Sequence, residues 1–321
     1  MQKRVFIEDV GRLIRKIGGE IFVWEIEDLF RDSKNPPLIY LVESKAGARF
    51  LLERGSFGRK KFELIQAIAQ TLFYCLPEKV LGEGPWRQFL IFRGAYPFDL
   101  QRPSKRILKY QLLPTTFLKL QRVLAPDNST WIVQESFCLG EFNGKIWFIP
   151  DTAIASGSTV EYLLRKGFQQ YLPQKVIVFT AAGSLQGIQR IWKICKEHKV
   201  ELVPIFSQCI FEVSEKGVLP NLPFTDLPIE NEKTITSRRF YKIAHRVYQG
   251  KRMCAVGDVG DSLENPIKYL LDTLKEIALL EIDPTKEGWE WVGQWFKKLW
   301  FRKKLKTEDP LTYSYLNGFW R

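Results

Sequence analysis

The sequence contains few histidines and cysteines and no long apolar run. Its two histidines, His198 and His245, lie among basic residues without a second ligand at metal-site spacing, so we expect both at the surface. Its cysteines are widely spread and form no CxxC pair, which argues against a disulfide framework or a thiolate metal site. They are Cys75, Cys138, Cys195, Cys209 and Cys254. We therefore expect reduced, mostly buried thiols and no metal site made directly by side chains.

Membrane-directed segments are also missing from the sequence. No apolar run reaches the ~18 residues that a membrane-spanning helix needs. The N-terminus reaches Glu8 and Asp9 before an apolar signal-peptide core could form. These absences predict a soluble, cytoplasmic protein.

Apolar residues and positive charge are abundant. Of 321 residues, 45% are apolar, 14% aromatic and 26% charged, which excludes collagen, coiled-coil and low-complexity classes and predicts a globular core. The 48 Lys and Arg against 36 Asp and Glu give a net charge of +12. Such a charge favours anionic partners, namely phosphorylated metabolites, nucleic acid or an acidic membrane surface.

The middle of the chain alternates apolar runs with helix-like stretches. The apolar runs cover 146–149, 176–179 and 200–206, and the helix-like stretches cover 159–166 and 188–198. This order is typical of an α/β fold with a mostly parallel central sheet and helices on both faces. Ligands of such sheets bind beyond the carboxyl ends of the strands.

The rest of the chain predicts flanking units. The pattern predicts a helix over 60–76, a strand over 88–92, and two β-rich runs at 20–26 and 38–42. The division that we predict is an accessory α+β segment at 1–55, a main domain at 56–283 with an insertion at 221–253, and a basic aromatic tail at 284–321.

A small-residue loop after the first apolar run of this series carries the strongest chemical signal. The loop, 151–159, reads Asp-Thr-Ala-Ile-Ala-Ser-Gly-Ser-Thr and opens a helix, so its backbone N–H groups and helix dipole can hold a phosphate. Hydroxyls of Ser156, Ser158 and Thr159 add donors. Asp151 can accept hydrogen bonds from two ribose hydroxyls or hold a hydrated Mg²⁺. The loop has neither the Lys of a P-loop nor GxGxxG, and a phosphorylated sugar fits it better.

These motifs, in this order, resemble the type I phosphoribosyltransferases, and the uracil phosphoribosyltransferases most. The loop matches that group's single acid, aliphatic residue and Ala-Ser-Gly-x-Thr pattern, and 181–188 resembles its Ala-Ala-x-x-Gly-Ile turn with two extra residues. Its Gly-Asp-x-Gly-Asp motif recurs at 257–261, and its pyrophosphate loop resembles 93–95. The resemblance covers roughly residues 58–280.

The resemblance implies a glycosyltransferase that moves ribose 5-phosphate from phosphoribosyl pyrophosphate to a nucleobase, a uracil-like pyrimidine first. It implies a C-terminal hood over the base, Mg²⁺ bound through the substrate, and a homodimer. The residue roles that it implies are catalysis by Asp151 and Arg93; ribose and phosphate binding by Asp151, Ala155, Ser156, Gly157, Ser158 and Thr159; pyrophosphate binding by Arg93, Gly94, Lys105 and Arg106; and base binding by Val256, Gly257, Asp258 and Gly260.

Two questions stay open from the sequence. The insertion at 221–253, and Ser262 where the family usually has Arg, favour an alternative, a catalytically silent regulator that senses a nucleotide and has RNA as a further partner. The stretch 289–306 predicts one basic amphipathic helix. That helix could lie on an anionic membrane, contact RNA, or dock on its own domain or a second subunit; docking is favoured because the aromatic stretch 310–316 also needs cover.

Overall fold

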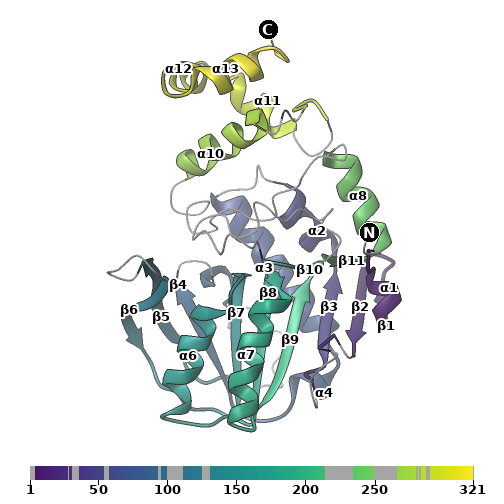
Figure 1. Cartoon of the computed structure of the whole chain (residues 1–321), viewed down its shortest axis with the longest axis vertical. Coiled ribbons are helices and arrows are strands. Elements are labelled where there is room, and N and C mark those ends of the chain that lie inside the picture. Colours follow the sequence, from purple (N-terminus) through teal and green to yellow (C-terminus); the bar gives the residue numbers. More distant parts are fainter. Residues whose placement is uncertain are drawn as a thin grey trace.

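The chain is built around one large sheet (Figure 1). In the computed structural model the described residues are 4–27, 29–30, 36–53, 58–92, 95–99, 111–124, 131–213, 234–248, 266–279, 281, 283–286 and 290–320. From edge to edge the strands are β1 (Gly11–Ile17), β2 (Ile21–Ile26), β3 (Ile39–Glu43), β9 (Glu201–Ser207), β8 (Lys175–Ser184), β7 (Ile146–Ile154), β4 (Trp86–Phe92), β5 (Thr116–Leu124) and β6 (Trp131–Leu139). Every neighbouring pair from β3 to β5 is parallel, and the remaining pairs on this path are antiparallel. The predicted α/β fold is confirmed.

Helices cover both faces of the parallel strands. On one face Trp147 and Ile149 of β7 pack with α6 (Ser158–Phe168) and α7 (Leu185–Glu197). On the other, Ile146 and Phe148 pack with α2 (Lys45–Leu52) and α3 (Gly58–Cys75). Successive strand residues point to opposite faces, so strands buried on both sides must be apolar at nearly every position. The helices and strands predicted for this region are therefore confirmed.

Two segments expected as loops belong to strands. The β7–β8 ladder continues through Asp151 opposite Thr180 and as far as Ile154 opposite Gly183. The prediction ended these strands too early because small and polar residues follow the apolar runs. The turn between β7 and α6 is consequently short, at 155–157.

The N-terminal segment extends the sheet. β3 pairs in parallel with β9, with Tyr40 opposite Ile205, and the β1–β2 hairpin continues it outward. Glu25 of β2 is only 3% exposed and accepts hydrogen bonds from Arg12 and from the Tyr40 hydroxyl. Burial alone raises the pKa of Glu25, but these hydrogen bonds and nearby cations together hold it below its usual value. The division of the chain at residues 55 and 283 stays a prediction.

Arg87 of β4 forms hydrogen bonds to the segments that precede β5 and β7. Its side chain is 2% exposed, and its guanidinium donates to the Pro114 carbonyl at 2.5 Å, to Asn143, and to Glu141 at 3.3 Å. Burial lowers the pKa of this guanidinium, and the Glu141 carboxylate opposes that effect. Arg87 thus joins the start of β4 to the chain before β5 and to the loop before β7.

Short elements complete the body of the protein. They are α1 (Ile7–Val10), α4 (Glu78–Leu81), the 3-10 helix η1 (Tyr96–Phe98), β10 (Cys209–Phe211), β11 (Ile235–Thr236) and α8 (Arg238–Tyr248). β10 pairs with β11 and with the end of β8, which brings α8 close to the carboxyl edge of the sheet. Cys75, Cys195 and Cys209 are buried and both histidines are exposed, as expected.

The C-terminal helices lie beyond the carboxyl ends of the strands, at the top of Figure 1. They are α10 (Pro266–Leu279), α11 (Glu290–Phe296), α12 (Leu299–Glu308) and α13 (Pro310–Asn317). The prediction of one continuous helix over 289–306 is wrong, because the chain breaks at Lys298, whose ψ is 115°. The break buries Phe301 and Leu305 and leaves Leu299 and Trp300 exposed. The buried side chains pack within the chain, as the docking alternative predicts. None of the described helices combines the length and hydropathy needed to cross a bilayer.

Candidate functional site at the carboxyl edge of the sheet

The turn between β7 and α6 forms the centre of the candidate site. Gly157 is the N-cap of α6, with φ 75° and ψ 0°, and no side chain caps the helix start. The Gly157 carbonyl accepts the first intrahelical bond, from the Glu161 N–H, at 2.9 Å. The N–H groups of the first helical turn therefore point out of the helix toward the edge of the sheet, where an anion would be stabilised.

A second turn braces the first. Ser184, the last residue of β8, caps α7 by accepting the Gly187 N–H at 2.8 Å, and its hydroxyl donates to the Ala155 carbonyl. The two backbones are so close that a Cβ on Gly157 would lie 2.5 Å from the Gly187 carbonyl oxygen. The segment 181–188 therefore holds the shape of the turn at 155–157.

Two hydroxyl groups stand beside the start of α6. The Oγ atoms of Ser156 and Ser158 are 3.1 Å apart, and the Ser158 N–H is 3.5 Å from Ser156 Oγ. Ser156, Ser158 and Thr159 are all half-buried. The structure thus brings together the hydroxyls and backbone amides that the sequence predicts as phosphate ligands.

Asp151 lies inside β7, below the turn. It is half-buried, and its Oδ1 lies 3.4 Å from the Ala153 N–H. The sequence placed Asp151 at the end of the strand, whereas three more strand residues follow it. Asp151 and Ser156 are nevertheless on the same short segment, so a carboxylate and a phosphate cradle remain neighbours.

A buried carboxylate that the sequence pattern did not predict as a site residue lies at the same edge of the sheet. Glu43 ends β3, is 2% exposed, and accepts hydrogen bonds from Ser237 Oγ and, at 2.9 Å, from Trp24 Nε1. Burial raises its pKa, although the hydrogen bonds from Ser237 and Trp24 oppose the shift. The sequence contains a signal that could have identified Glu43, because this carboxylate directly follows an apolar run, as Asp151 does.

Glu43 connects the insertion to the sheet. Ser237 also accepts the Phe240 N–H at 3.0 Å, so the residue that binds Glu43 also caps the start of α8. The described part of the insertion, 234–248, is therefore fastened at the edge where the phosphate cradle lies.

The other predicted site residues lie outside the described part of the chain. They are Arg93, Gly94, Lys105, Arg106, Val256, Gly257, Asp258 and Gly260. The pyrophosphate and base sites therefore stay predictions.

Comparison with known proteins gives partial structural likenesses. No family model matches the sequence, and no curated protein matches it. The AQ2163 protein from Aquifex aeolicus is 19% identical, with 56% of this chain and 91% of that one covered and a TM-score of 0.40. A purine phosphoribosyltransferase from Pyrococcus horikoshii is 13% identical (44% and 80% covered, TM-score 0.29), and an adenine phosphoribosyltransferase from Trypanosoma brucei is 10% identical (53% and 83%, TM-score 0.32). At these identities and scores the likenesses assign neither a family nor an activity to this chain.

Proposed function

We propose that this protein binds phosphoribosyl pyrophosphate at the carboxyl edge of its sheet and transfers ribose 5-phosphate to a nucleobase. The observation that carries the proposal is the uncapped start of α6 beside the Ser156 and Ser158 hydroxyls, in a turn held by Ser184. This turn offers several N–H and O–H donors, and the one carboxylate in the first turn of α6, that of Glu161, is paired with Arg165 and Arg190, so the donors suit a phosphate dianion.

In this proposal each element of the edge has one task. The turn from Ala155 to Thr159 binds the 5-phosphate, and Asp151 accepts hydrogen bonds from the ribose hydroxyls. The pyrophosphate would be held by Arg93, Gly94, Lys105 and Arg106, and Mg²⁺ would be bound through the substrate.

The chemistry requires positioning more than a strong base. The bond from C1 of the ribose to pyrophosphate breaks and its electron pair leaves with pyrophosphate, while a bond from a base nitrogen to C1 forms and that nitrogen loses its proton to solvent. Positive charge builds on the ribose ring in the transition state. Fixed hydrogen bonds to the phosphate and the ribose hydroxyls lower the barrier by orienting the reactants. Backbone groups from Val256 to Gly260 would contact the base, for which a uracil-like pyrimidine is our first candidate.

A second candidate function is a nucleotide sensor without turnover, in which RNA is a further partner. The observation that favours it is the Glu43–Ser237 bond, which fixes part of an insertion at the edge where an acceptor base would have to enter. Both functions require the same phosphate cradle, and a homodimer is compatible with either.

The first experiment is a calorimetric titration with phosphoribosyl pyrophosphate and Mg²⁺. Asp151→Asn removes hydrogen bonds to a charged acceptor, each worth about 1.5–3 kcal/mol, so we expect binding to weaken by about tenfold to a hundredfold. Asp283→Asn, at an exposed turn of the C-terminal region, is the control and should bind normally. Normal binding by Asp151→Asn would refute the assignment.

A panel of nucleobases then separates the two functions. Release of pyrophosphate together with nucleotide formation, from one base only, identifies an enzyme and its acceptor. Binding without release for any base supports the sensor.

A further inference from the structure

The helix α12 has a buried side and an exposed side, and packing within the chain accounts only for the buried one. Phe301 and Leu305 are fully buried, whereas Leu299 is 67% exposed and Trp300 is 50% exposed. Figure 1 shows α12 and α13 at the end of the molecule opposite the sheet. Two large apolar side chains are therefore presented to solvent at one end of the molecule.

The break between α11 and α12 brings lysines next to these apolar side chains. Lys297 and Lys298 join the two helices, and α12 begins at Leu299. All four residues from 297 to 300 are exposed. Lys303 is exposed too, and it lies on the same side of α12 as Leu299 because residues four apart are neighbours on a helix. We call residues 297–300 together with Lys303 the α12 corner.

Nearby carboxylates do not neutralise the charge of the α12 corner. Residues 297–309 contain six Lys and Arg and two acidic residues, Glu308 and Asp309, which gives a net charge of +4. Glu308 pairs with Lys304, and Asp309 accepts hydrogen bonds from Thr312 at the start of α13. In the described part of the chain, no carboxylate lies within ion-pair distance of the three corner lysines. The corner therefore favours a negatively charged partner.

The exposed ring of Trp300 is held in place by its neighbours. It meets the Trp295 ring edge to face, with centroids 6.2 Å apart, and the buried Phe301 ring with centroids 5.6 Å apart. Lys298 Nζ in turn lies 4.1 Å from the Trp295 centroid. Because the ring is already packed on one side, its transfer into an apolar phase loses little side-chain entropy.

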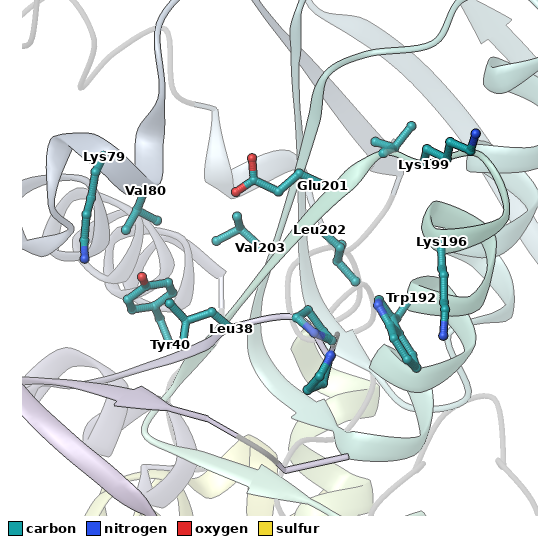
Figure 2. A pocket seen from close by; sticks show the side chains of 13 residues that line it. Leu38, Tyr40, Lys79, Val80, Trp192, Lys196, Lys199, Glu201, Leu202 and Val203 are labelled. Atoms are coloured by element: carbon teal, nitrogen blue, oxygen red, sulfur yellow. The ribbon is translucent and has the colours of Figure 1, made fainter. Parts of the chain in front are cut away.

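A second place where a lysine lies beside a tryptophan shows what is particular to the corner. Figure 2 shows Lys196 and Trp192 on the wall of a pocket of about 460 Å³ at the amino ends of β3 and β9. There Trp192 is only 9% exposed, between Phe30 and Lys196, and Lys79 lies 3.9 Å from the Glu25 carboxylate. That pocket has no open aromatic face. At the α12 corner, by contrast, the aromatic ring is open to solvent.

The residue types of the corner fit an anionic lipid bilayer better than a nucleic acid. Tryptophan is enriched where headgroups meet acyl chains, leucine inserts into the acyl boundary, and lysines stay among the headgroups. A nucleic acid would contact the lysines through its phosphates and stack a base on Trp300, but an exposed aliphatic side chain adds little to either contact. Leu299 is therefore the residue that favours a bilayer.

We propose that the α12 corner binds the surface of a membrane that contains anionic lipids. Leu299 and Trp300 insert at the boundary between headgroups and acyl chains, and the corner lysines lie among the headgroups. The corner belongs to the C-terminal helices and the phosphate cradle to the start of α6, so this binding does not depend on the proposed function.

The test is sedimentation of the full chain with lipid vesicles. One set of vesicles contains two parts of phosphatidylcholine to one part of phosphatidylserine, and the comparison set contains phosphatidylcholine alone. We expect binding to the anionic set to be at least about tenfold tighter, because each lysine near an anionic surface strengthens binding about fivefold. Added salt should weaken this binding, since it screens the attraction between the lysines and the lipid headgroups.

Lysine variants test whether the charge acts at the corner. Lys297→Gln/Lys303→Gln removes two corner lysines and should weaken binding to the anionic vesicles by about 10- to 30-fold. Lys193→Gln/Lys199→Gln is the control, because it removes the same charge from two exposed side chains elsewhere on the surface. The control should bind as the unmodified protein does. A loss in the control as large as that in the corner variant would overturn the proposal.

Apolar variants test the insertion. Leu299→Ser/Trp300→Ser should weaken binding at least about tenfold, because two apolar side chains no longer leave water. Tyr171→Ser/Leu172→Ser is the matched control, since it replaces a neighbouring aromatic and leucine that are 38% and 51% exposed between α6 and β8. This control should bind normally. Equal urea midpoints show that a variant is folded, and normal binding of phosphoribosyl pyrophosphate keeps this test separate from that of the proposed function.

Tryptophan fluorescence gives a second measurement of the insertion. Vesicles whose phosphatidylcholine carries brominated acyl chains should quench the fluorescence of the unmodified protein, and should quench Leu299→Ser/Trp300→Ser less at saturating lipid. Absence of sedimentation with the anionic vesicles would overturn the proposal. So would binding that Leu299→Ser/Trp300→Ser leaves unchanged, or binding of a single-stranded RNA without binding of vesicles.

Discussion

The contact between Gly157 and Gly187 allows a quantitative test of the candidate site. Gly157→Ala adds one methyl group at a residue with φ 75°, and this methyl carbon would lie 2.5 Å from the Gly187 carbonyl oxygen and 3.1 Å from the Gly187 Cα. Both neighbours are backbone atoms, so no side chain can rotate away. The turn at 155–157 and the start of α7 must move apart.

The expected loss of stability has two parts. A non-glycine residue in the left-handed region costs about 1–2 kcal/mol. Forcing a methyl group into closely packed surroundings costs about 1–3 kcal/mol more. We therefore expect Gly157→Ala to lower the free energy of unfolding by about 2–5 kcal/mol.

Gly19→Ala is the matched control. Gly19 has φ 72°, and nothing lies within 4 Å of the position of its Cβ. This variant has the backbone strain without the contact, so it should lose only about 1–2 kcal/mol. Urea unfolding followed by circular dichroism gives both values, provided that the slopes of the two transitions agree.

The same two variants, Gly157→Ala and Gly19→Ala, also test whether the turn at 155–157 binds phosphate. If the turn forms the phosphate cradle, Gly157→Ala should weaken phosphoribosyl pyrophosphate binding at a temperature where the variant is still folded, and Gly19→Ala should not. If the two variants lose equal stability, the turn at 155–157 does not contact the start of α7. That result would refute the inference that 181–188 holds the shape of the phosphate-binding turn.

Three further predictions concern buried polar groups. Arg87→Met leaves the Pro114 carbonyl and Asn143 Oδ1 without the donor that Arg87 supplies, whereas the exposed Glu141 carboxylate still accepts from Asn143 Nδ2; urea unfolding should therefore show a loss of about 1–3 kcal/mol. The pKa of Glu25 is lower in the folded state, so its stabilising effect is present above its ordinary pKa and is lost as the pH falls through the folded value; Glu25→Gln should flatten the pH dependence of the urea midpoint below about pH 5. Burial raises the pKa of the Cys195 thiol to about 12, so a thiol reagent at pH 8 should modify it only after unfolding, and modification of the native protein at mass-identified Cys195 would contradict its burial.

Much of the central fold could be predicted from the sequence because strands buried on two faces require continuous apolar runs. The runs at 146–149, 176–179 and 200–206 each mark a real strand, β7, β8 and β9. The ends of the strands were harder, since Ala153 and Ala181 lie in the ladder although small residues are also common in turns. Apolar content identifies the middle of a buried strand better than its end.

Only part of the site could be predicted, and which part depended on how far apart its residues lie in the sequence. Ser156, Gly157 and Ser158 are neighbours in sequence, so their pattern alone shows that they form one turn. Glu43 and Ser237 are far apart in sequence, and only the folded chain brings the residue before α8 to the end of β3. The break at Lys298 escaped prediction because it depends on which aromatic residues find room in the core.

The pairing of β3 with β9 sets an order for folding during synthesis. Tyr40 and its partner Ile205 are 205 − 40 = 165 residues apart, so β3 leaves the ribosome long before the strand that covers its edge. At about 5–20 residues per second, this interval is about 8–33 s. During that time β3, which pairs with β2 on one edge, lacks its parallel neighbour β9 on the other edge. The nascent chain therefore carries an exposed strand edge for about half of its synthesis, and a chaperone that binds extended apolar segments would act there.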